Sequence, residues 1–100
     1  MSGNPLDNYK KIDSEVIKTF ENLQHLALSE GKLPQKIKYL IAMAIDAEHG
    51  TVQGAIALGK RAIVLGATKE EIVETLRVAY YIGGTGALYT SAMTLQSLFK

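Results

Sequence analysis

Residues 62–74 read AIVLGATKEEIVE, and this stretch decides the fold class. Gly66 ends an apolar run, because glycine adopts at little cost the left-handed conformation that closes a helix. Thr68 begins the next helix, since its hydroxyl can accept from a free backbone N–H, while Glu71 can reach back to the threonine N–H. The stretch therefore predicts a helix end, a tight turn and a helix start in succession.

The helical period extends outward from this stretch in both directions. Apolar residues recur at spacings of three and four, and no segment alternates β-branched residues as a strand does. Asp13 or Ser14 is expected to cap the first helix, and Gly31 and Gly50 to end the first and second. The pattern predicts an all-α fold of about five helices, over about residues 13–30, 34–49, 51–65, 68–82 and 85–99.

The chain has the size of one domain, with residues 1–12 expected as a loose N-terminal arm and residues 13–100 as the helical domain. Residues 37–45 are apolar at nearly every position after Lys38, so this helix is expected to be buried on most sides. Helices this apolar cannot all be hidden inside one small monomer. We therefore expect a homo-oligomer.

Charge and composition limit the function classes. The formal net charge is +1 and the basic residues are spread out, so neither nucleic acid nor an anionic membrane is expected as a partner. No apolar run approaches the roughly 18 residues that suggest a membrane span, and residues 1–11 lack the apolar centre of a signal peptide. The absence of cysteine is consistent with a reducing compartment. We expect a cytoplasmic protein.

Three segments resemble a known family. They are residues 33–44 (LPQKIKYLIAMA), 62–74 and 79–88 (AYYIGGTGAL), and they follow one another at the right separations without a gap. Over about residues 33–95 the chain is similar to the carboxymuconolactone decarboxylase / alkyl hydroperoxide reductase D-like family. The resemblance implies an all-α domain built on an antiparallel helical pair and assembled as trimers or hexamers.

The resemblance also implies a catalytic pattern for the redox branch of the family: Glu, eleven residues, Cys, two residues, Cys, three residues, His. Anchored on Gly66, this pattern places the glutamate at Tyr39 and the histidine at Leu58. The two cysteines fall on Thr51 and Gly54. All four functional groups are therefore missing from this chain.

This loss excludes thiol peroxidase and disulfide reductase chemistry, whatever peroxidase-like antioxidant label the family carries. The chain has no cysteine at all. A threonine hydroxyl forms no disulfide and is not ionised at neutral pH, so Thr51 cannot replace a thiolate. The resemblance implies that the decarboxylase branch also keeps a histidine at the position of Leu58, which puts that activity in doubt as well.

A polar cluster, Asp46, Glu48 and His49, ends an otherwise apolar helix just before Thr51. Asp46 and His49 are three residues apart and share a helix face, so they can form a carboxylate–imidazole acid–base pair. Alternatively, the helix end simply reaches solvent, where charges are expected and a histidine gains from the helix dipole. Thr51 is expected to cap the next helix, with Gln53 beside it.

The remaining polar residues have ordinary structural explanations. Glu21 and His25 form a second pair one helical turn apart, but inward-facing carboxylates are too few to predict a metal, and no cofactor is expected. Residues 83–86 (GGTG) follow a helix rather than a strand, so they predict a helix–helix turn and not a phosphate loop. Four tyrosines are expected to pack at interfaces: Tyr39, Tyr80, Tyr81 and Tyr89. Arg61 and Arg77 are expected to lie on helix surfaces or to bind a carboxylate ligand.

Two functions stay open. One is a non-redox enzyme acting on a small organic acid or lactone, with Asp46, Glu48, His49 or Arg77 beside a buried pocket. The other is a non-catalytic homo-oligomer that binds a partner or a small ligand. A pocket at the helix junction that holds His49 and a carboxylate would favour the enzyme, and a small or dry pocket would favour the binding protein.

Overall fold

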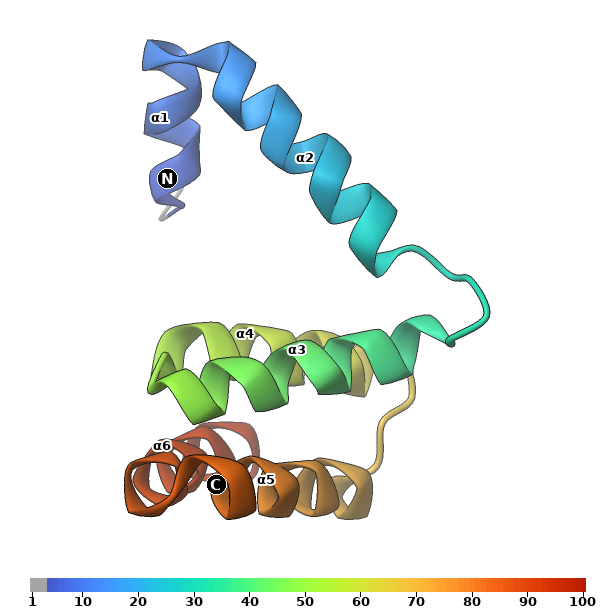
Figure 1. Ribbon diagram of the computed structural model, residues 1–100, viewed down its shortest axis with the longest axis vertical. Helices are drawn as coiled ribbons and strands as arrows, with labels where there is room; N and C mark the ends of the chain where they lie inside the picture. The colour runs from blue at the N-terminus through green and yellow to red at the C-terminus, as the bar shows by residue number, and fades with distance from the viewer. Residues whose placement is uncertain (1–3) are drawn as a thin grey trace.

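The computed structural model describes residues 4–100. These residues contain no strand, so the predicted all-α fold is confirmed. They form six helices (Figure 1): α1 (Pro5–Ile12), α2 (Ser14–Leu28), α3 (Gln35–His49), α4 (Val52–Val64), α5 (Lys69–Gly83) and α6 (Thr85–Leu98).

The extra helix, α1, corrects two expectations, the loose arm over residues 1–12 and the count of five helices. Asn4 caps α1 by accepting from the Leu6 N–H at 2.9 Å. Pro5 occupies the first turn, where its missing N–H is not needed. Capping residues, rather than a long apolar period, mark this helix, so the apolar spacing did not predict it. Residues 1–3 lie outside the described residues.

Helix α2 begins as predicted and ends differently. Asp13 Oδ1 accepts from the Val16 N–H at 3.2 Å, which confirms Asp13 as the N-cap. The expected stop at Gly31 is wrong, because the helix ends at Leu28 and its C-cap residue, Ser29, has an extended conformation with φ −70° and ψ 155°. The chain leaves α2 through extended backbone, a conformation that needs no glycine.

Local signals fix the other helix boundaries. Gly50 and Gly66 have φ angles of 83° and 105°, so both predicted stops after α3 and α4 are confirmed. At the start of α5, Thr68 Oγ1 accepts from the Glu71 N–H at 3.1 Å. Glu71 Oε1 accepts from the Thr68 N–H at 2.9 Å, which completes the predicted capping box.

Helices α3 to α6 form a compact body of two layers, in which α3 and α4 lie over α5 and α6 (Figure 1). Met43 and Ile72 are fully buried in its core. Gly59 lies at a close crossing, where a Cβ would be 2.7 Å from Leu98 Cδ1 and 3.1 Å from Met43 Sδ. Small side chains complete the core and allow the helices to approach closely: Ala47, Ala55, Ala62, Ala67 and Ala79.

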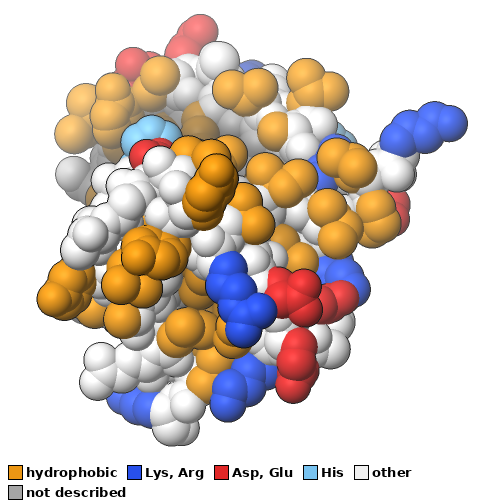
Figure 2. Space-filling model, turned by 60° about the horizontal axis from the view of Figure 1, so that its bottom comes forward, with side chains coloured by type: hydrophobic (Ala, Val, Ile, Leu, Met, Phe, Trp, Pro, Cys, Tyr) orange, Lys and Arg blue, Asp and Glu red, His pale blue; other side chains and the backbone are white. Residues whose placement is uncertain are grey.

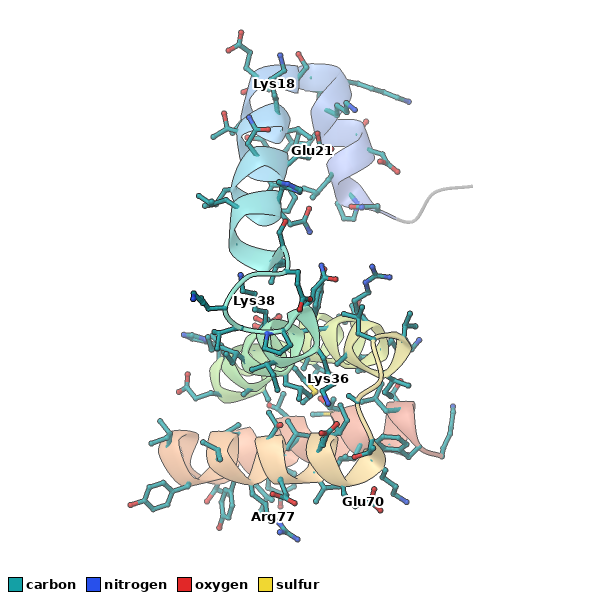
Figure 3. The ribbon with its side chains drawn as sticks, turned by 90° about the vertical axis from the view of Figure 1, so that its right-hand side faces the viewer. Lys18, Glu21, Lys36, Lys38, Glu70 and Arg77 are labelled. Atoms are coloured by element: carbon teal, nitrogen blue, oxygen red, sulfur yellow. The ribbon has the colours of Figure 1, made fainter. Side chains whose placement is uncertain are left out.

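Helices α1 and α2 form an N-terminal hairpin that stands clear of this body (Figures 1 and 3). The hairpin meets the body where α2 leads into α3. Ile17 is the only buried side chain of α2. None of the described helices is long and apolar enough to cross a lipid bilayer.

Candidate functional site

The predicted polar cluster lies where α3 turns into α4. The Thr51 N–H donates to the Asp46 carbonyl at 2.8 Å, which fixes the turn. The His49 side chain is 65% exposed, and its Nδ1 lies 2.9 Å from the Ile45 carbonyl and 3.6 Å from Glu48 Oε1. Because a carbonyl only accepts, we assign the hydrogen to Nδ1. The Nδ1–H of His49 therefore donates to the Ile45 carbonyl, Glu48 is its ion-pair partner when the imidazole is protonated, and the imidazole faces solvent.

Asp46 points into the start of α4. A Cβ at Gly54 would overlap Asp46 Oδ2 and would lie 3.0 Å from its Cγ and 3.2 Å from Thr51 Cγ2. The carboxylate thus lies against bare backbone in the first turn of α4, where the helix dipole favours a negative charge. Position 54 is the place that the resemblance gives to the second thiol. A carboxylate from α3 now covers it.

The other two positions of the redox pattern belong to the core packing. Tyr39 and Leu58 are partly buried and pack against the buried core cluster. The Arg61 guanidinium carbon lies 5.9 Å from the centre of the Tyr39 ring, a cation–π distance. An aromatic ring under an arginine and an aliphatic side chain therefore stand at the two positions that the resemblance gives to the glutamate and the histidine.

The expectation that residues 37–45 are buried on most sides is only partly right. Leu40 and Met43 are buried, but Ile41 and Ile45 are exposed on the outer side of α3. They border an open apolar hollow of about 380 Å³, lined by Ile37, Leu40, Ile41, Ala44, Ile45, Thr75 and Val78. The apolar run itself was the signal for this surface, but sequence alone could not separate core from exposed face.

Glu48 borders a second apolar hollow. This hollow has a volume of about 230 Å³ and shares Ala44, Ile45 and Val78 with the first. Gly83 lets Glu48 approach α5, since a Cβ there would lie 2.9 Å from Glu48 Cγ. The side chains of the three polar residues of the predicted cluster thus point to different places: Asp46 packs against the start of α4, Glu48 borders the hollow next to α5, and His49 is exposed to water.

The remaining candidate residues lie apart from this junction. His25 Nδ1 contacts Ser29 Oγ at 3.2 Å near the end of α2. Arg77 borders a hollow along α5 together with Glu70 and Glu74. Arg77 and Glu70 lie on the side of α5 that faces away from α3 and α4 (Figure 3). Gly84, with a φ of 83°, forms the predicted turn between α5 and α6. Within residues 4–100, no three histidine, aspartate or glutamate side chains gather closely enough to hold a metal ion.

One ion pair joins the starts of α3 and α5 and was not foreseen. Lys36 Nζ lies 3.0 Å from Glu71 Oε2. The backbone hydrogen bond from Thr68 and then Lys36 together hold the pKa of Glu71 below its ordinary value. Glu71 therefore serves both the capping box and the contact between the layers of the body.

Comparisons with known proteins agree with this architecture. The sequence profile of the carboxymuconolactone decarboxylase family matches residues 14–95, a range that includes α2. An uncharacterized protein of Cupriavidus necator is 32% identical over 73 residues, which cover 72% of this chain. The chain spans 65% of the length of that curated relative.

A solved structure is also similar. The crystal structure of an apo carboxymuconolactone decarboxylase family protein from Legionella pneumophila superposes with a TM-score of 0.88. The two sequences are 33% identical, and the match covers 92% of this chain and 82% of the other. Both the sequence profile and the superposition confirm the predicted resemblance: this chain belongs to the carboxymuconolactone decarboxylase family.

Proposed function

We propose that this chain is a non-catalytic, self-associating binding or scaffold protein that keeps the family fold without its thiol chemistry. The observation that carries the proposal is the state of the four positions of the redox pattern. Tyr39 and Leu58 pack on the core, and Gly54 lies under a carboxylate. Thr51 is exposed and is not a thiol. Three of these positions supply packing, and none of the four supplies a thiol nucleophile or the glutamate and histidine of a proton relay.

Exposed apolar side chains support self-association. Figure 2 shows hydrophobic side chains spread over one face of the molecule. Large contiguous apolar patches are rare on monomers and usually mark interaction sites. A second copy of the same chain is the partner that is always present, and closed homo-oligomers are the commonest assemblies. A trimer or hexamer, as the resemblance implies, is the assembly we propose.

Two measurements on the purified protein test this proposal. Sedimentation velocity at micromolar concentration should give a species larger than the 10.9 kDa chain. Incubation with tert-butyl hydroperoxide and a dithiol donor should consume no more peroxide than buffer does. A monomer would contradict the self-association, and peroxide turnover would contradict the loss of the redox chemistry.

A second candidate is a non-redox enzyme acting on a small organic acid or lactone, and one observation favours it. Asp46 brings a carboxylate to the position of the missing second thiol, and a carboxylate can transfer protons as a general base. The test is carbon dioxide release from a carboxymuconolactone, measured for the wild type and for Asp46→Asn. Turnover that is lost in Asp46→Asn, with the assembly unchanged, would favour this candidate. No turnover by the wild type would count against it.

A further inference from the structure

The N-terminal hairpin carries an apolar stripe that its own chain leaves uncovered. We define the hairpin stripe as Val16, Phe20, Leu23 and Leu26, which recur at helical spacing along one side of α2. Their exposed fractions are 42%, 43%, 62% and 76%. An amphipathic helix normally buries its apolar face against another element. The stripe therefore lacks the partner that its pattern calls for.

Residues 29–34 join α2 to α3, and we call this segment the elbow. Hydrogen bonds at the elbow hold the hairpin away from the body of its own chain. Gln35 Nε2 donates to the Leu28 carbonyl at 2.9 Å, and Lys38 Nζ donates to the Ser29 carbonyl at 2.8 Å. The Gln35 N–H also donates to Glu30 Oε1 at 2.9 Å. Folding α2 back over its own α3 would break these bonds. The direction of the hairpin (Figures 1 and 3) thus leaves the stripe free for another molecule.

The body carries an apolar surface of matching kind. We define the body groove as Ile37, Ile41 and Ile45 of α3 with Val78 and Ile82 of α5, which line the two joined hollows beside Glu48. A third hollow of about 280 Å³ continues the groove to the elbow, where Ile41 and Ile45 meet Ala27, Leu28 and Leu33. The lining of the groove is mainly apolar, as in a helix-binding groove, with Lys38, Thr75 and Glu48 as its polar members.

We propose that the hairpin stripe of one copy packs into the body groove of a second copy. This inference rests on the proposed self-association and assigns it to two surfaces. At about 1.5 Å per residue the stripe, from Val16 to Leu26 on α2, extends about 15 Å, and the α3 side of the groove, from Ile37 to Ile45, extends about 12 Å, so the two surfaces are similar in length. Every copy carries both the stripe and the groove, so two copies related by a two-fold axis, which the proposed hexamer would contain as a pair of trimers, can exchange hairpins and cover both surfaces on each molecule.

The area is sufficient for a specific interface. A large side chain presents roughly 150 Å² when it is fully exposed, so four half-exposed side chains on each surface present about 300 Å². One stripe in one groove then covers about 600 Å², and a reciprocal exchange covers about 1,200 Å², the lower limit for specific complexes. A single contact without exchange would fall in the range of weak encounters.

Cross-linking tests the contact directly, because the chain has no cysteine of its own. Leu23→Cys is co-expressed with an affinity-tagged Val78→Cys chain, and the mixture is treated with a short bismaleimide. The control replaces Val78→Cys by Val64→Cys, whose parent side chain is 74% exposed on α4 outside both surfaces. We expect a covalent heterodimer with Val78→Cys and none with Val64→Cys. Equal cross-linking of the two pairs, or none in either, would overturn the proposal.

Sedimentation equilibrium provides a second, independent test. Leu23→Asp places a charge in the centre of the stripe, and Val64→Asp is the matched control. Loss of a central apolar contact should raise the dissociation constant of the assembly by at least about thirtyfold, with little change for Val64→Asp. An unchanged assembly in Leu23→Asp would overturn the hairpin exchange and leave self-association standing. A monomeric wild type would instead contradict the proposed function itself.

Discussion

Replacing Gly54 by alanine tests whether the Asp46 carboxylate and the bare backbone of α4 depend on each other. Alanine in a helix is favoured over glycine by up to about 1 kcal/mol. At Gly54 this gain is opposed, because the new Cβ overlaps Asp46 Oδ2. Turning the carboxylate aside costs about 0.5–1.5 kcal/mol if its rotamer is strained, and forfeits about 0.3–1 kcal/mol of helix-dipole interaction. We therefore expect Gly54→Ala to be neutral or destabilising.

Removing the Asp46 carboxylate should reveal the stabilisation that alanine provides over glycine within the helix. In an Asp46→Ala background, Gly54→Ala should stabilise the protein by about 0.5–1 kcal/mol, which gives a coupling energy of about 1 kcal/mol between the two positions. Gly86→Ala is the matched control, since no atom lies within 4 Å of its Cβ position, and it should stabilise both backgrounds equally.

The assay is urea and thermal unfolding of the four variants of the cycle, followed by circular dichroism at one protomer concentration, because association shifts apparent stability. A difference of 1 kcal/mol corresponds to about 4–8 °C in Tm for a domain of this size. A coupling energy below about 0.3 kcal/mol would mean that the two sites are independent. Asp46 would then not lie over Gly54, and the explanation for the lost second thiol position would fail.

The body and its caps yield three further predictions. Gly59→Ala should destabilise by about 1–3 kcal/mol in urea unfolding, because its Cβ would lie 2.7 Å from Leu98 Cδ1; stabilisation would show that this crossing is not tight. Met43 is fully buried, so Met43→Ala should lower the free energy of unfolding by about 2–5 kcal/mol. Val64 is exposed, so Val64→Ala should change it by less than about 0.5 kcal/mol, and equal effects of the two substitutions would contradict the burial of Met43. The pKa of Glu71 is lowered in the fold, so the stabilisation it provides is complete above its unfolded pKa of about 4.3 and is lost as the pH falls through the lower folded value. The stability advantage of the wild type over Glu71→Gln should therefore shrink as the pH falls from 6 to below 4, and a constant difference would contradict the role of the charge.

The helices of the body and the family membership could be predicted from the amino-acid sequence. Gly50, Gly66 and Thr68 act through backbone conformation and hydrogen bonds to near neighbours, so the predicted boundaries there were correct. Where a boundary needed no special residue, as at Ser29, the expectation of a glycine stop failed. The missing thiols were also determined by sequence, because a reaction that needs a sulfur atom cannot proceed on a chain without one.

The positions of the polar and apolar side chains, by contrast, depend on how the helices pack against one another. Spacing placed Asp46 and His49 on one helix face, but the carboxylate lies against Gly54 on the next helix and the imidazole faces water. The apolar period of α2 indicated a buried face, yet α2 stands clear of the body and the side chains of this face stay exposed. Periodicity shows that a helix has an apolar side, but what covers that side depends on how distant segments approach, and local sequence does not encode that approach.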